Sequence, residues 1–332
     1  MKETDLTPES IREIAYAFQR SRILLTAYEL GIFTAVGDRR ESSQNVAQTL
    51  GTDWRATDRL MNALAAMGLL VKEHGTFRNP PSGSSFLLPS SPDYMSGLMH
   101  TVHLWDTWST LTEAVRLGTS VSAQQQRRAD PTTWTKAFIA AMNDRARKQA
   151  PVVAAQMDLK ESMRVLDVGG GSGAFAVAFV RAEKGVTATV FDLPMVLPLT
   201  ETYVSAEGLK GRIELVAGDY TRDELPGGYD LVFLSAIIHS NSSDQNRRLM
   251  RKCARALNPK GRLVVQDFIM DENRTEPPGG AFFALNMLVG TVAGDTYTES
   301  EIRDWMKEAG LSDIKRVETP FGSAQIRGKK LG

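Results

Sequence analysis

Val165-Leu166-Asp167-Val168-Gly169-Gly170-Gly171-Ser172-Gly173-Ala174-Phe175 is an apolar run that ends in an acid and a cluster of glycines. An apolar, helix-compatible stretch, residues 174–180, follows at once, so the order is strand, tight turn and helix N-terminus. Glycine lets the backbone come close to a ligand because it has no Cβ, and the helix start offers free N–H groups and a partial positive charge. The stretch predicts a turn that binds a polar, extended ligand, rather than a plain connection between strand and helix.

From residue 164 onward, strand and helix patterns alternate, which predicts a parallel sheet with helices on both faces. The expected strands are 164–168, 187–191, 213–217, 229–234 and 262–266, each followed by a helix, with late strands near 315–319 and 323–327. Further helices are expected near 281–289 and 299–308. Ligands of such sheets bind beyond the carboxyl ends of the strands, so the residues just past each strand carry the functional prediction.

Those residues are mostly acidic or polar. They are Asp167 with its glycines after the first strand, Asp192 and Leu193 after the second, Gly218-Asp219-Tyr220 after the third, Ser235 and then His239 after the fourth, and Asp267 after the fifth. An acid after the second strand can accept two ribose hydroxyls. An acid after the third can accept the exocyclic amine of an adenine, with an apolar or aromatic neighbour packed on the ring. The pattern therefore predicts an adenosine cofactor.

Two adenosine cofactors compete for this pattern. The glycine turn also satisfies the dinucleotide fingerprint, Gly169-x-Gly171-x-x-Ala174, and Asp192 lies at about the right distance for NAD. However, Asp167 sits inside the turn, where it would repel a pyrophosphate and attract an ammonium or a sulfonium. S-adenosylmethionine carries both cations, so the sign of the charge favours it over NAD.

The N-terminal third predicts a winged helix: helices at 11–31, 44–50 and 54–67, then a two-stranded wing at 69–78. One alternative is therefore a DNA-binding regulator. The expected recognition helix, 53–59, carries two acids against two bases, and the whole chain has 39 basic and 39 acidic residues. Without a basic surplus, binding to nucleic acid or to anionic membranes is not favoured. The module is instead expected to pack against a partner chain or to roof the active site.

Residues 80–93 read as a loop, 94–118 as one helix with an aromatic face, and 134–157 as a helix broken at Pro151. Phe138 and Met142 share a helix face; such stripes usually belong to a core, and some of their members can line an apolar pocket for a flat organic substrate.

The 332 residues, with 42% hydrophobic and 23% charged residues, indicate a soluble protein of two domains. A single cysteine, Cys253, no secretory leader, no span of about 20 apolar residues and no metal-ligand spacing predict a cytoplasmic, metal-free protein.

Together these motifs resemble the S-adenosylmethionine-dependent O-methyltransferases, the family that includes plant caffeate and flavonoid enzymes, hydroxyindole O-methyltransferases and bacterial polyketide O-methyltransferases. The matching segments are 166–173, 191–194, 218–220, 298–301 and 308–311, in the order of the family. The resemblance implies an α/β fold: a seven-stranded class I methyltransferase (Rossmann-like) sheet with an N-terminal, all-helical winged-helix dimerisation domain. It predicts a homodimer with a dimerisation domain at 1–95, helices of a linker and substrate pocket at 96–158, and a catalytic domain that binds S-adenosylmethionine at 159–332.

The resemblance also implies roles for single residues. Cofactor binding falls on Asp167, Gly169 and Gly171 for the methionine part, Asp192 for the ribose, and Gly218 and Asp219 for the adenine, with Tyr220 or Leu193 packed on its faces. It also falls on Ser235, where the plant enzymes carry a lysine. The general base falls on His239 and its carboxylate on Asp267, while Phe138, Met142 and Asn286 fall on the substrate pocket. Two positions depart from the family pattern: Ser240-Asn241 replaces Asp-Trp, and a second carboxylate falls on Thr296, next to Asp295.

The expected reaction is methyl transfer to a hydroxyl of an aromatic or polycyclic small molecule. A phenol with a pKa near ~10 is ionised to about one part in a thousand at neutral pH, a deficit of roughly 4 kcal/mol. A positioned imidazole contributes ~10²–10⁴-fold, which matches that deficit. The alternatives are C- or N-methylation on the same fold, a cofactor-binding protein without catalysis, and the DNA-binding regulator.

Overall fold

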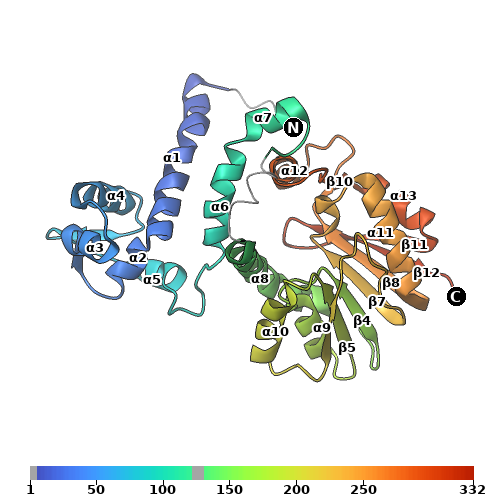
Figure 1. Ribbon diagram of the computed structural model, residues 1–332. Coiled ribbons are helices and arrows are strands. Elements are labelled where there is room, and N and C mark those ends of the chain that lie inside the picture. Colours follow the sequence, from blue (N-terminus) through green and yellow to red (C-terminus); the bar gives the residue numbers. More distant parts are fainter. Residues whose placement is uncertain (1–5, 122–130) are drawn as a thin grey trace. The chain divides into compact units, whose positions relative to one another are not determined.

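The computed structural model describes residues 6–121 and 131–332 (Figure 1). Two compact units divide the chain, residues 1–104 and 105–332, and each is described by itself. The three-part division at residues 95 and 158 stays a prediction. Among the described residues, none of the helices combines the length and the apolar character that a membrane span requires.

The N-terminal unit contains helices and a small sheet. The helices are α1 (Pro8–Leu30), α2 (Ile32–Val36), α3 (Ser43–Leu50), α4 (Trp54–Ala66), α5 (Pro81–Leu87) and the first turns of α6 (Leu98–Trp108). The sheet has the order β1-β3-β2, with β1 (Glu41–Ser42), β2 (Val71–Glu73) and β3 (Thr76–Arg78). The three expected helices and the wing are confirmed, and Gly31 and Gly51 end helices in the left-handed conformation. The unit is mainly helical, as expected, and its wing has a third short strand, because β1 pairs with β3.

Two sequence predictions between residues 80 and 118 are also wrong. The expected loop at 80–93 contains α5, which begins at Pro81, where the fixed φ of proline suits a first helical turn. The single helix expected at 94–118 is two helices, α6 and α7 (Leu111–Leu117). The hydroxyls of Ser109 and Thr110 donate to the carbonyls of Trp105 and Thr107, and such local bonds favour the end of a helix.

The C-terminal unit is built on a seven-stranded sheet with the order β11-β12-β8-β7-β4-β5-β6. Its strands are β4 (Arg164–Val168), β5 (Thr187–Asp192), β6 (Ile213–Ala217), β7 (Tyr229–Ser235), β8 (Leu257–Asp267), β11 (Leu311–Glu318) and β12 (Ala324–Lys330). All seven predicted strands are confirmed. Strands β4 to β8 run parallel, and β12 is antiparallel to both of its neighbours. Val168 pairs with Phe191 and Leu234, so the carboxyl ends of three strands meet at one edge.

Helices cover both faces of this sheet (Figure 1). One face carries α8 (Pro131–Ala155), α9 (Ala174–Ala182) and α10 (Leu197–Ala206); the other carries α11 (Ser243–Ala256) and α13 (Glu299–Glu308). The expected break of α8 at Pro151 is wrong. The helix runs on, because Val153 and Ala154 are buried in the core and their packing offsets the one backbone bond that proline cannot make.

Other differences lie at the edge where the strands end. A helix was expected after β6, but residues 218–228 form a turn and loop. A single helix, α12 (Pro278–Gly290), follows β8, and a short parallel pair, β9 (Ile269–Met270) and β10 (Tyr297–Thr298), flanks it. These segments and the short 3₁₀ turn Ile238–Ser240 surround the site described next.

Candidate functional site

A cavity of about 620 Å³ opens beyond the carboxyl ends of β4 to β8. Residues of these strand ends line it together with one face of α8. Of the twelve expected site residues other than His239 and Asp267, eleven line the cavity: Asp167, Gly169, Gly171, Asp192, Leu193, Gly218, Asp219, Tyr220, Ser235, Phe138 and Met142. His239 and Asp267 line it as well. The topology therefore gathers expected site residues as far apart in the sequence as Phe138 and Asp267 around one space.

The glycine turn after β4 leaves almost no room for side chains. Gly169 and Gly171 have φ values of 66° and 58°, a left-handed conformation that L side chains rarely adopt. A Cβ on Gly169 would lie 2.3 Å from Cδ1 of Ile237, and a Cβ on Gly170 would lie 2.7 Å from Oδ2 of Asp167. The turn thus exposes bare backbone to the cavity.

Asp167 lies beneath this turn and is 1% exposed. Burial, and secondarily the charge of Asp192, raise the pKa of Asp167 to about 7. Among the side-chain atoms that the structure describes, its Oδ2 is one of the few that are buried without a hydrogen-bond partner. A cation in the cavity would stabilise the ionised carboxylate, so this part of the site fits a ligand that carries an ammonium or a sulfonium.

Asp192 ends β5 next to the same turn. Its Oδ2 accepts a hydrogen bond from the N–H of Gly171 at 2.8 Å, and its Oδ1 accepts one from the N–H of Leu193 at 2.7 Å. Burial raises the pKa of Asp192, and these two N–H groups act in the opposite direction. The two bonds fix the carboxylate in one orientation, and its remaining lone pairs are available for hydroxyl groups.

The third strand end supplies a platform for a flat ring. Asp219 accepts from the hydroxyl of Thr221 at 2.6 Å and from its N–H at 2.9 Å, and the hydroxyl bond is the main cause of a lowered pKa of Asp219. Burial raises the pKa of Tyr220 to about 12, so its phenol stays neutral. A Cβ on Gly218 would lie 2.2 Å from the ring of Phe191, which packs tightly beneath. Lys252 holds the loop from below by donating to the carbonyls of Tyr220 and Asp223.

His239 and Asp267 form a hydrogen-bonded pair on the cavity wall. The Nδ1 atom of His239 lies 2.8 Å from Oδ1 and 3.0 Å from Oδ2 of Asp267. The side chains are 12% and 2% exposed. Because a carboxylate only accepts, it selects the tautomer with the proton on Nδ1, which leaves the lone pair of Nε2 for another group. Phe283 of α12 packs edge-on against the imidazole at 4.8 Å, so the ring is held on its face as well.

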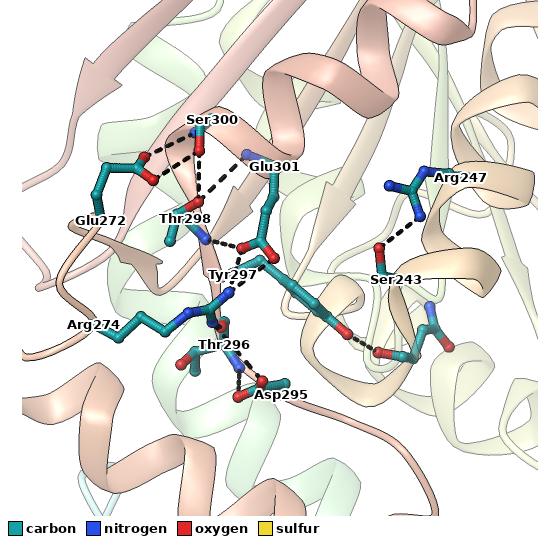
Figure 2. A network of polar contacts seen from close by, with 11 residues as sticks. Ser243, Arg247, Glu272, Arg274, Asp295, Thr296, Tyr297, Thr298, Ser300 and Glu301 are labelled. Carbon is teal, nitrogen blue, oxygen red and sulfur yellow. Dashed lines mark hydrogen bonds and ion pairs between the residues drawn. The ribbon is translucent and has the colours of Figure 1, made fainter.

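The second carboxylate of the family pattern has no counterpart in this pair. Asp295, the neighbour of Thr296, is not among the described residues that line the cavity. Its Oδ2 lies 3.8 Å from Nη1 of Arg274, and its Oδ1 accepts from the N–H of Thr296 (Figure 2). Arg274 also donates to both oxygens of Glu301 and to the carbonyl of Thr296 (Figure 2). Only the backbone of Asp295 reaches the site, where its N–H donates to the carbonyl of His239 at 3.0 Å. Asp295 is therefore a support of the loop.

The departure at Ser240-Asn241 also has a structural explanation. Asn241 is 4% exposed and accepts from the hydroxyl of Tyr220 at 3.3 Å, while its amide donates to Asn246. Asn246 in turn donates to the carbonyl of Ile238 at 2.8 Å, and the hydroxyl of Tyr297 donates to the carbonyl of Asn241. Asn241 thus ties the 3₁₀ turn of His239 to the Tyr220 ring. Its role was missed because a buried polar hub has no local sequence signal.

The remaining expected site residues are Phe138, Met142, Asn286 and Ser235, and all but Asn286 line the cavity. Phe138 stacks on Trp134 at 5.2 Å, and both line the cavity from α8 with Met142. Asn286 is outside the lining: its side-chain oxygen accepts from the indole N–H of Trp108 at 2.8 Å, which joins α12 to the end of α6. Ser235 lines the cavity and accepts from Gln266, which accepts from Gln325.

Comparison with known proteins identifies the family. A family model described as O-methyltransferase domain matches residues 108–312, and one described as O-methyltransferase dimerisation domain matches residues 12–89. This chain belongs to the O-methyltransferase family. It is an S-adenosylmethionine-dependent methyltransferase with an N-terminal dimerisation domain, as its sequence motifs predict. The cofactor fits the glycine turn, the partnerless Asp167 Oδ2 and the two acids at the ends of β5 and β6.

Several relatives of this methyltransferase have named activities. The 3-hydroxy-5-methyl-1-naphthoate 3-O-methyltransferase of Streptomyces sahachiroi is 32% identical over 330 residues, which cover 97% of this chain and 95% of the relative. TcmO of Streptomyces glaucescens, a tetracenomycin polyketide synthesis 8-O-methyl transferase, is 29% identical with 97% of each chain covered. OxyT of Streptomyces rimosus, an N,N-dimethyltransferase, is 27% identical with the same coverage. The solved structure of PigF with SAH is 26% identical, has a TM-score of 0.89 and covers 98% of this chain and 100% of its own.

Proposed function

We propose that this methyltransferase moves a methyl group from S-adenosylmethionine to a hydroxyl of an aromatic small molecule, with His239 as the general base. The observation that carries the proposal is the His239–Asp267 pair, which faces the cavity with its Nε2 atom unengaged by Asp267. The aromatic acceptor is supported by Trp134, Phe138 and Met142 on the wall of the same cavity. The names of the naphthoate and tetracenomycin relatives support the same substrate class.

When bound, the cofactor would supply a methyl group on its sulfonium: an oxygen–carbon bond would form as the carbon–sulfur bond breaks, and S-adenosylhomocysteine would leave. The glycine turn and Asp167 would hold the methionine part, the Asp192 carboxylate would accept the ribose hydroxyls, and Asp219 would accept the adenine amine with Tyr220 against the ring. The aromatic wall of α8 would align the acceptor. Holding the acceptor oxygen at attack distance can contribute roughly 7–11 kcal/mol.

His239 would take the proton of the acceptor hydroxyl at Nε2. Asp267 would fix the tautomer and stabilise the imidazolium that forms, as in other His–Asp arrangements. Asp295 has no part in this function, because its carboxylate pairs with Arg274 and Asp295 is not among the described residues that line the cavity. The catalytic group is thus a pair of residues, and Phe283 together with the backbone bond from Asp295 holds it in place.

Product analysis tests this function. Purified enzyme is incubated with methyl-labelled S-adenosylmethionine and a panel of naphthols, hydroxyquinones and arylamines. We expect label on oxygen in the hydroxyarenes. Label on nitrogen or carbon alone would replace the proposal with the alternative that the N,N-dimethyltransferase relative represents. No transfer to any acceptor would favour a silent cofactor-binding protein.

The pKa of Asp167 predicts a pH dependence of cofactor binding. In the free protein this carboxyl has a pKa of about 7, and the cations of the cofactor would lower it. Binding therefore releases a proton, and affinity rises with pH until the free protein is ionised. Between pH of about 6 and about 8 we expect the affinity for S-adenosylmethionine to rise up to tenfold, measured by calorimetry in two buffers of different ionisation enthalpy.

The control for this prediction is Asp167→Asn, which has no proton to release. We expect weaker binding in this variant and a smaller pH slope. S-adenosylhomocysteine, which lacks the sulfonium, should show a smaller slope on the wild-type protein. An equal slope in Asp167→Asn would assign the titration to another group.

We infer that the dimerisation domain forms a homodimer through the first half of α1. Apolar side chains there are exposed: Ile11 by 53%, Ile14 by 73% and Phe18 by 54%. Buried residues of α1 occur only in its second half, at Leu25, Ala27 and Tyr28. An apolar helix face of this kind is typical of an interface between chains.

Charge on this face should dissociate the dimer. For Ile14→Glu/Phe18→Glu we expect a monomer in light scattering at concentrations where the wild type is a dimer, since each buried carboxylate costs several kcal/mol. Arg55→Glu, on an exposed position of α4, is the matched control and should stay dimeric. A dimer that survives both changes in α1 would exclude this face as the interface.

A further inference from the structure

One charged residue that lines the cavity, Arg145, has no role in the reaction described above. Among the described residues that line it, Arg145 is the only lysine or arginine, against four aspartates: Asp167, Asp192, Asp219 and Asp267. Each aspartate has a task in the proposed function, at the cofactor or at His239. Arg145 has none, although a guanidinium is always charged and offers five N–H donors in a planar fork.

Among the described residues, the contacts of Arg145 leave the N–H donors of its guanidinium available to a ligand. Its guanidinium carbon lies 5.2 Å from the centre of the Phe268 ring, a cation–π contact. None of the ion pairs found among the described carboxylates includes Arg145. Its side chain is exposed as well as lining the cavity, so a partner can reach it without a large loss of hydration.

Helix geometry places Arg145 on the acceptor side of the cavity. Phe138, Met142, Arg145 and Gln149 follow at spacings of four, three and four, so they form one stripe along α8, apolar at its start and polar at its end. A neighbouring stripe contains Ile139, whose Cδ1 atom would lie 3.6 Å from a Cβ on Gly171, and this stripe faces the glycine turn. The Arg145 stripe is rotated away from the turn at which the methionine part would lie.

Aromatic contacts connect Arg145 to the general base. Phe268, under the guanidinium, follows Asp267 in the chain and packs on Phe283 at 4.8 Å. Phe283 contacts the His239 imidazole, also at 4.8 Å. Arg145, Phe268 and His239 all line the cavity, and Phe283 behind them connects the rings of Phe268 and His239. A flat molecule with its hydroxyl at His239 would present its far end to Arg145.

Resting on the proposed function, we propose that the acceptor is an anionic hydroxyarene, with a carboxylate at the end remote from the methylated hydroxyl, and that Arg145 binds this carboxylate. Arginine and carboxylate form paired N–H···O bonds that fix orientation as well as charge. The pair would therefore select which hydroxyl reaches His239. Gln149, one turn further along the stripe, adds an amide beside the same end.

The experiment compares matched acceptors on the enzyme loaded with S-adenosylhomocysteine. The probes are 6-hydroxy-2-naphthoate, whose carboxylate and hydroxyl lie at opposite ends of the ring system, its methyl ester, and 2-naphthol, which lacks the carboxylate. By calorimetry we expect the wild type to bind the hydroxynaphthoate about tenfold more tightly than either neutral probe. Arg145→Gln should remove this preference without changing the affinity for 2-naphthol, and Arg145→Lys should keep part of it. Lys148→Gln, an exposed position of α8 outside the cavity, is the control for net charge.

Each other outcome overturns the inference in a distinct way. Equal binding of the three probes to the wild type would show that the cavity does not recognise a carboxylate. This comparison needs no variant. A loss of S-adenosylhomocysteine affinity in Arg145→Gln, with the acid preference intact, would assign Arg145 to the carboxylate of the cofactor. If the wild type binds none of the three, the aromatic acceptor itself is wrong, whereas equal binding contradicts the anionic acceptor alone.

Discussion

His239→Gln is expected to lower turnover on a phenolic acceptor by about 10²–10⁴-fold. The acceptor hydroxyl would keep its proton, since glutamine cannot accept it at Nε2, and a neutral hydroxyl is a poor nucleophile. Asp267 would still have an amide donor within the space of the ring, so the buried carboxylate is not stranded. The measurement is single-turnover methyl transfer, with the affinity for S-adenosylmethionine determined on the same preparation and expected to be unchanged.

A more acidic acceptor provides a check on this reason. A nitrophenol is ionised at neutral pH to a far greater extent than an ordinary phenol, so His239→Gln should slow its methylation much less. The control variant His74→Gln changes an exposed histidine in the turn between β2 and β3 and should leave both rates unchanged. Turnover of the ordinary phenol within a few fold of the wild type would mean that alignment alone carries the reaction.

Asp192→Ala is expected to weaken S-adenosylmethionine binding on the order of 100-fold. A hydrogen bond to a charged group contributes about 1.5–3 kcal/mol, and two ribose hydroxyls would lose this partner. The N–H groups of Gly171 and Leu193 also lose theirs, so the turn itself becomes less fixed. Calorimetry measures the affinity, and far-ultraviolet circular dichroism verifies that the sheet is intact.

Two further variants, Asp192→Asn and Asp304→Ala, test this second prediction more closely. Asp192→Asn keeps one accepting oxygen and should lose less affinity than Asp192→Ala. Asp304→Ala removes an exposed aspartate on α13 and should change nothing. Wild-type affinity in Asp192→Ala would contradict the assignment of the ribose to the end of β5.

The sequence was sufficient for the parts of the fold that depend on local chemistry. The strand, glycines and helix at 164–182 could be predicted because glycine adopts the left-handed turn more readily than any other residue, and because a buried strand has an apolar sequence. The acids at Asp192 and Asp219 were found by their place after strands. Parallel pairing then brings them to one edge, whatever the connections between the strands.

Features that depend on distant packing were not predictable. The continuation of α8 past Pro151 relies on the burial of Val153 and Ala154 against the sheet. The exclusion of Asp295 from the His239 site follows from Arg274, which lies 21 residues away and pairs with Asp295 and Glu301 (Figure 2). Arg145 went unnoticed because an arginine within a long, polar helix is ordinary, and only the fold reveals that it faces the cavity.

The most direct test is a crystal structure of the ternary complex with S-adenosylhomocysteine and a hydroxyarene. We expect the adenosine between Asp192 and Asp219 and the sulfur beside the glycine turn. The hydroxyl oxygen should lie about 2.6–3.2 Å from Nε2 of His239, with the sulfur on the side from which a methyl group would arrive. An acceptor hydroxyl bound out of reach of the imidazole would contradict the role of His239 as the base, and an adenosine away from the ends of β5 and β6 would contradict the cofactor site.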